Sequence, residues 1–169
     1  MSKYTAKCVT CQCREDPEEV KRTIYSDDKV RVALRGDNQV WLARAVIVPH
    51  EHIAPDQVYE KHPDLVQHVF CTVVPWLNSK CKQLYGMSMA NLAQLGNLTT
   101  DEHGEKTSVA AYFHWHVHWI PRYETAPIVL DQAFPDPQWG AALNLDTKAG
   151  LPIVKPSADL LQRIKSDFQ

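Results

Sequence analysis

YFHWHVHWIPR, residues 112–122, has the most informative pattern in the sequence. Its aromatic and β-branched residues alternate with His114, His116 and His118, a pattern that predicts a strand ended by Pro121. Successive side chains of a strand point to opposite faces, so the three imidazoles share one face at spacings of roughly 6.6 Å. The intervening aromatic residues face the core. Because aligned imidazoles have little value as packing, we expect a chemical site on the histidine face.

The segments before this strand predict a meander followed by a long helix. Strands are expected at 21–26, 29–34 and 39–49, joined by turns at 27–28 and 36–38. The apolar stripe over residues 63–85 predicts a helix that begins at Pro63 and is kinked or divided by Pro75. Gly86 ends it.

The remaining segments complete the sheet and add a second helix. A strand at 87–94 is expected to pair with the histidine strand across the long polar loop 95–106. Ser157 is a suitable N-cap for a terminal helix that ends at Phe168. The sequence therefore predicts an α+β fold. It has an antiparallel sheet of about five strands, one long helix packed on the sheet and a C-terminal helix.

Composition indicates a single domain of residues 1–169, with a cysteine-containing arm at 1–20 and a C-terminal extension at 123–169. The chain has 18 basic and 20 acidic residues and a net charge of −2, which gives bulk nucleic-acid binding no support. We see neither the apolar core of a signal peptide nor a transmembrane run. The five cysteines, in a chain without an export signal, favour thiols or metal ligands over disulfides. We expect a cytoplasmic protein.

The histidine strand admits two chemical uses. Histidines two residues apart on a strand can ligate one metal ion, because both rings approach it from the same face. Alternatively, one imidazole is a nucleophile that attacks phosphorus and forms a phosphohistidine, while its neighbours orient phosphate or supply a proton. An incidental surface patch is the remaining interpretation.

His114-x-His116-x-His118-x-x-Pro121-Arg122 resembles the signature of the histidine triad (HIT) superfamily of nucleotide hydrolases and transferases. The order of elements over roughly residues 8–122 is also similar, so the resemblance implies a HIT-like fold. It implies that His116 attacks the α-phosphate of a nucleotide and that His118 contacts the phosphate or assists the leaving group. Three candidate substrate contacts follow from the same resemblance. They are Asn91, Asp37 near the ribose, and Arg122, which either orients phosphate or caps the strand end.

Cys8-x-x-Cys11 has the spacing of two zinc ligands, but two thiolates are only half a site. The resemblance, which here extends to galactose-1-phosphate uridylyltransferases, implies that His52 and His114 complete a structural zinc site. Cys13 and His50 are spare ligands for Cys11 and His52. A loose reduced tail and a redox Cys-x-x-Cys are the alternatives.

Two departures from the HIT pattern concern the substrate. The usual Gly-Gln-Ser/Thr-Val-x-His lead into the triad is replaced by Ala-Ala-Tyr-Phe at 110–113, and the loop 95–106 is longer and more acidic than a phosphate cradle. The expected function is hydrolysis or transfer at the α-phosphate of a dinucleoside polyphosphate, nucleotide sugar or nucleoside phosphoramidate. The alternatives are a non-catalytic nucleotide- or zinc-binding module, and a metalloenzyme that uses the strand histidines as ligands. The resemblance also implies a homodimer.

Overall fold

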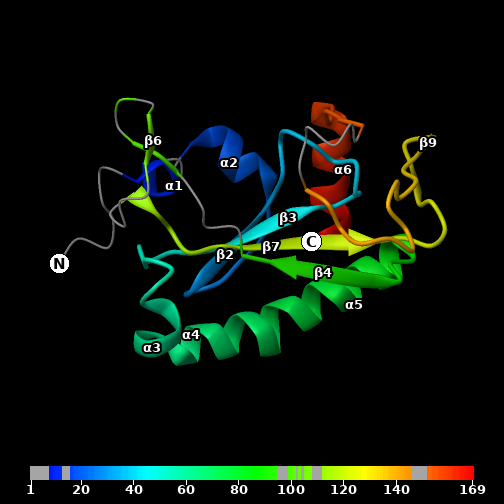
Figure 1. Ribbon diagram of the computed structural model, residues 1–169. Coiled ribbons are helices and arrows are strands. Elements are labelled where there is room, and N and C mark those ends of the chain that lie inside the picture. Colours follow the sequence, from blue (N-terminus) through cyan, green and yellow to red (C-terminus); the bar gives the residue numbers. More distant parts are fainter. Residues whose placement is uncertain are drawn as a thin grey trace.

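The computed structural model describes residues 8–12, 16–94, 99–101, 103, 105–107, 112–145 and 152–169. Its centre is a five-stranded sheet in the order β1-β2-β3-β7-β4, and every neighbouring pair is antiparallel (Figure 1). The strands are β1 (Thr23–Ser26), β2 (Val30–Leu34), β3 (Ala45–Pro49), β4 (Met89–Ala93) and β7 (Val117–Arg122). The predicted α+β class and five-stranded antiparallel sheet are confirmed.

Strand β7 carries the end of the histidine segment and lies between β3 and β4. His118 pairs with Val46 on one side and with Ala93 on the other. Val117 and Trp119 point to the opposite face, where they join the main hydrophobic core. The alternation in the sequence thus places one polar and one apolar face on the same strand.

The strand begins later than the sequence predicts, at Val117 instead of Tyr112. The preceding residues are not paired in the sheet, and the backbone N–H of Trp115 donates to the Ile53 carbonyl at 2.8 Å. Pro121 lies inside the strand and does not end it. It pairs with Ala90 of β4 beyond the last pair with β3, Ala45 and Trp119, where a missing donor is tolerated.

The third strand is also shorter than the predicted 39–49. Residues 39–44 form an irregular turn in which Ala43 has a φ of 64°. The buried Gln39 amide donates to the carbonyls of Arg35 and Arg44 at 2.7 and 2.9 Å, and so replaces a strand ladder at this point.

One long helical layer covers the apolar face of the sheet (Figure 1). It consists of α4 (Pro63–His68), a π-helical turn (Val69–Val73) and α5 (Val74–Tyr85), after the short α3 (Val58–Lys61). Pro75 falls in the first turn of α5, so the predicted division occurs through the wider π turn that precedes the proline. Gly86, with a φ of 69°, ends the helix as predicted.

Two further helices lie near the β1 edge. The N-cap of α6 (Ala158–Phe168) is Ser157, whose hydroxyl accepts from the Leu160 amide, as predicted. This helix contacts β1 and α2 (Pro17–Arg22), and Phe168 at its end packs against Trp76 and Tyr85 of α5. The remaining elements are α1 (Val9–Gln12), the hairpin β5 (Thr99–Thr100) and β6 (Lys106–Thr107), and the hairpin β8 (Ile128–Val129) and β9 (Gln132–Ala133). Among the described helices, none has the length and apolar character needed to cross a membrane.

The C-terminal extension is fastened to the end of β7 by a buried ion pair. Arg122 donates to both carboxylate oxygens of Asp136, at 2.5 and 3.3 Å, and both side chains are almost fully buried. The same guanidinium donates to the Asn91 side chain and the Gln138 carbonyl. Asp136 also accepts from the Trp41 indole. Burial opposes ionisation of Asp136, but Arg122 and the Gln138 amide outweigh it and lower the pKa of the carboxyl.

Replacing Asp136 should therefore destabilise the fold. We expect Asp136→Ala to lower the free energy of unfolding at pH 7 by about 3 kcal/mol, because it leaves a buried guanidinium without its partner. The deficit should shrink as the pH falls below about 4, since the lowered pKa means that wild-type stability is itself lost on protonation. Urea unfolding at pH 7 and pH 3 measures both effects.

Lys21→Ala is the control, because it removes an ion pair that is exposed on both sides and should leave the free energy of unfolding nearly unchanged. Equal losses in the two variants would contradict the importance assigned to the buried pair.

Candidate functional site

Four predicted metal ligands lie together at the start of the histidine segment. The ligand atoms of Cys8, Cys11, His52 and His114 all lie within 4.8 Å of one another. Cys11 Sγ is 3.4 Å from Nδ1 of both histidines, and Cys8 Sγ is 3.8 Å from Nδ1 of His114. Helix α1 and the residue before it supply the thiols, while His52 comes from the loop that follows β3.

The protonation state of the two histidines fits a divalent cation. Burial lowers the pKa of His52, and burial together with the nearby His52 ring lowers that of His114 to about 4, so both rings are neutral at pH 7. His114 Nε2 donates to the Pro49 carbonyl at 3.0 Å, which leaves the lone pair on Nδ1 and directs it toward the thiols. Burial, with the adjacent Cys11, raises the pKa of Cys8 to about 11. Two buried thiols and two neutral imidazoles form a Cys2His2 donor set of the kind that binds structural zinc.

Of the two predicted spare ligands, only His50 belongs to the described part of the chain. Cys13 lies outside the described residues. His50 lies apart from the cluster, with its Nε2 atom 2.9 Å from the Asp27 carbonyl and 3.4 Å from the Ser26 hydroxyl.

His116 is oriented by the backbone of His114. Its Nδ1 atom is 2.9 Å from the His114 carbonyl, to which it can only donate. Burial is the main cause that lowers the pKa of His116, and Arg35 adds to it, so the ring is neutral at pH 7. A neutral ring with its proton on Nδ1 carries a lone pair on Nε2. That is the form an imidazole nucleophile requires.

His118 stands beside His116 on the polar face of β7. The ring centroids are 5.0 Å apart and the ring planes are at 71°. Burial lowers the pKa of His118 to about 3, helped by His116 and by the charges of Arg44 and Arg35. Its Nδ1 atom is buried and has no hydrogen-bond partner among the described residues.

The three predicted substrate contacts are dispersed around the polar face. Asn91 lies on β4 opposite Ile120, and its side-chain oxygen accepts from Arg122, which leaves its amide donors for another group. The Arg122 guanidinium is occupied by Asp136, Asn91 and Gln138, an arrangement that favours the strand-end role over phosphate binding. Asp37 is exposed and binds Arg35 through both carboxylate oxygens, at 2.8 and 2.5 Å.

Solved structures of HIT proteins share this architecture. A HIT family protein from Bacillus anthracis is 23% identical, with 94% of this chain and 92% of that chain covered and a TM-score of 0.52. A Zn-bound histidine triad family protein from Mycobacterium smegmatis is 16% identical over 94% and 93% of the two chains, with a TM-score of 0.51. A mutant uridylyltransferase is 16% identical, with a TM-score of 0.57; 95% of this chain and 46% of that chain are covered. No protein-family model and no curated protein matches the sequence.

This chain has the histidine triad fold. The predicted resemblance to HIT proteins and uridylyltransferases is therefore confirmed at the level of the fold. Residues 108–111, which include the first half of the Ala-Ala-Tyr-Phe segment before the triad, lie outside the described part of the chain.

Sequence reasoning missed two arginines on the polar face of this HIT sheet. Arg35 directly follows β2 and Arg44 directly precedes β3, and both lower the pKa of His118. A signal was present: Arg31, Ala33 and Arg35 alternate along β2, and Arg44 is two residues before Val46, the partner of His118.

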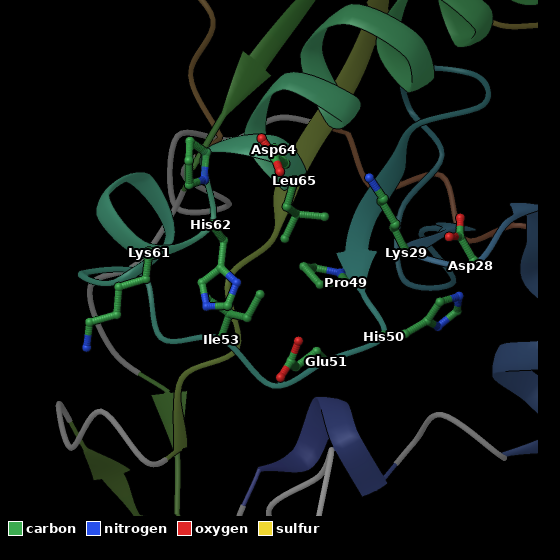
Figure 2. Close-up of a pocket in the computed structure, with 11 residues that line it drawn as sticks. Asp28, Lys29, Pro49, His50, Glu51, Ile53, Lys61, His62, Asp64 and Leu65 are labelled. Carbon is green, nitrogen blue, oxygen red and sulfur yellow. The ribbon is translucent and has the colours of Figure 1, made fainter. Parts of the chain in front are cut away.

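A separate hollow of about 410 Å³ is lined by the loop that follows β3, the turn between β1 and β2, and the residues around the start of α4. Figure 2 shows His62, Glu51 and Lys29 around it, with Leu65 and Ile53 as its apolar lining. His50, the predicted spare ligand for His52, is one of its lining residues, and Ile53 is the neighbour of His52. The hollow is lined by charges of both signs and by neither His116 nor His118, so it is distinct from the histidine face.

The charges around His118 give a prediction for its titration. Because the Arg44 guanidinium disfavours the imidazolium, Arg44→Gln should raise the His118 pKa, while Arg163→Gln, a change on the exposed face of α6, should leave it unchanged. Histidine NMR titration measures both. An unchanged or lower His118 pKa in Arg44→Gln would contradict the electrostatic coupling.

Proposed function

We propose that this protein is a nucleotide hydrolase or nucleotidyltransferase that acts at an α-phosphate through a covalent nucleotidyl-His116 intermediate. The observation that carries the proposal is the contact between His116 Nδ1 and the His114 carbonyl. It assigns the proton to one ring nitrogen and leaves the other as the nucleophile.

In the first step, the lone pair of His116 Nε2 forms a nitrogen–phosphorus bond as the bond from phosphorus to the leaving group breaks. The leaving group departs with that electron pair. In the second step, water or an acceptor hydroxyl attacks the phosphorus, loses its proton and releases the imidazole. His118, neutral and 5.0 Å away between ring centroids, donates its N–H to a phosphate oxygen or to the leaving group.

The similar structures support this reading. One is a uridylyltransferase, and several bear the histidine triad name. The Asn91 amide, on the strand next to β7, is proposed to contact phosphate or ribose. Asp37 is proposed to act mainly through Arg35, to which it is bound. The homodimer implied by the resemblance stays a prediction, which sedimentation equilibrium would test.

We also propose that Cys8, Cys11, His52 and His114 hold one structural zinc ion. The Zn-bound HIT structure supports the choice of metal, and the donor set supports the site. A cation bound there would favour the thiolate forms of the two cysteines and tie the N-terminal arm to the start of β7. Among the described residues, the metal-type cluster includes neither His116 nor His118.

The nucleophile is tested with His116→Ala. This variant should lose at least about a thousandfold in turnover and should form no covalent intermediate, because no other group replaces the attacking nitrogen. Rapid quench with α-³²P-labelled nucleoside triphosphates, diphosphate sugars and dinucleoside polyphosphates, followed by mass spectrometry at neutral pH, measures the intermediate. His62→Ala, which changes the separate hollow, is the control and should react like wild type.

Wild-type protein that binds nucleotides tightly yet forms no intermediate and turns none over would overturn the proposal in favour of a binding module.

The metal site is tested by zinc content. We expect one zinc per chain in the wild type and in His116→Ala, and loss of the metal in Cys8→Ala and His52→Ala. Cys71→Ala removes an exposed cysteine of the helical layer and is the matched control. Elemental analysis measures the metal, and chelation should lower the melting temperature of the wild type. Loss of zinc in His116→Ala with retention in Cys8→Ala would instead indicate a catalytic metal on the strand histidines.

A further inference from the structure

Two arginines lie side by side at the end of the polar face, beyond His118. The backbone N–H of Arg35 donates to the Arg44 carbonyl at 2.9 Å, so the two residues stand opposite each other at adjacent strand ends. Val46 pairs directly with His118, and Arg44 is two residues from Val46 on the same face. The Arg44 side chain therefore lies diagonally across from His118, and the charges of both arginines act on that ring.

The backbone around the arginines is fixed by a fully buried side chain. The Gln39 amide donates to the carbonyls of both Arg35 and Arg44. The Gln39 backbone N–H donates to the Val154 carbonyl at 2.8 Å, which joins this turn to the C-terminal extension. The hydrogen bonds of Gln39 thus hold two positively charged residues next to each other. This arrangement is unfavourable for Arg44, because burial and the Arg35 charge both lower its pKa.

Buried polar atoms on this face lack partners. Arg44 Nε and His118 Nδ1 make no hydrogen bond with any described residue, and both side chains are at least nine-tenths buried. Leaving such groups unpaired costs free energy, so the arrangement is understandable if a ligand accepts from the donors. The Arg44 guanidinium also lies over the Trp41 ring, 5.5 Å from its centroid, which keeps its plane in place.

The charged groups around Arg35 and Arg44 indicate the chemical class of the ligand. One carboxylate, Asp37, faces the two guanidinium groups, and it is paired with Arg35. Among the described residues, the Arg44 guanidinium has no ion-pair partner, and it lies next to the proposed phosphate-side histidine. A phosphoryl group offers several acceptor oxygens and the negative charge that this pair of arginines lacks.

We propose that Arg35 and Arg44 bind the phosphoryl group that adjoins the reacting phosphorus, so that the substrate contains a phosphoanhydride. This assignment rests on the proposed function. It selects dinucleoside polyphosphates, nucleoside polyphosphates and nucleotide sugars, and it excludes nucleoside phosphoramidates, whose single phosphoryl group is held by the histidines. Arg44 is the principal contact, because Arg35 is shared with Asp37.

The test is calorimetric binding of inorganic pyrophosphate and inorganic phosphate to full-length His116→Ala protein. Pyrophosphate should bind more tightly than phosphate. Arg44→Gln in this background should weaken pyrophosphate binding by at least about tenfold, as expected for loss of a charge-assisted hydrogen bond. Arg35→Gln should weaken it less. Arg163→Gln removes the same charge from the exposed face of α6 and should leave it unchanged.

Two variants distinguish lost binding from misfolding. Arg44→Lys keeps the charge and should recover part of the pyrophosphate affinity. Arg35→Gln changes a more exposed side chain, whose replacement should disturb the fold less. Equal binding of phosphate and pyrophosphate, or equal losses in Arg44→Gln and Arg163→Gln, would overturn the proposal. These measurements need no turnover. A protein that selects pyrophosphate through Arg44 but forms no covalent intermediate would therefore refute the proposed reaction and leave the anion site standing.

Discussion

His114 makes three interactions on which the rest of the site depends. Its Nε2 donates to the Pro49 carbonyl, its Nδ1 faces the two buried thiols, and its own carbonyl lies against Nδ1 of His116. The first interaction fixes the tautomer that permits the second, and the third fixes the tautomer of the neighbouring histidine. The N-terminal arm, the loop after β3 and the nucleophile are therefore connected through one residue.

The strands of the sheet position the second part of the site, which consists of His118 and Arg44. Strand β7 places His118 on the polar face. The turn at residues 39–44 delays the start of β3 to Ala45, and Arg44 then lies diagonally across from His118. The ion pair of Arg122 with Asp136 then holds the C-terminal extension against the far end of β7. The cationic end of the face and the metal-type cluster thus lie on opposite sides of His116 along the chain direction, and each is organised by its own buried polar contacts.

Alternation in the sequence was sufficient to predict that His116 and His118 share a polar face, because strand geometry is local. Resemblance to a known signature was needed for His52, which is distant in the sequence from Cys8. The start of β7 was predicted too early, since the alternation continues through residues that the Ile53 carbonyl and the cysteine cluster draw away from the sheet. The sequence did not identify Arg44 as a site residue, because residues 39–49 were predicted to form one continuous strand. Its position depends on the Gln39 amide, a contact between side chain and backbone that periodicity does not encode.

The proposed reaction depends on the His114 carbonyl, which holds His116 as the Nδ1-protonated neutral tautomer. Long-range ¹H–¹⁵N NMR of uniformly labelled protein at pH 7, with the His116 signals assigned through His116→Gln, measures this state directly. We predict an Nδ1 shift typical of a protonated nitrogen and an Nε2 shift typical of an unprotonated one. An Nε2-protonated ring, or an imidazolium at pH 7, would contradict it.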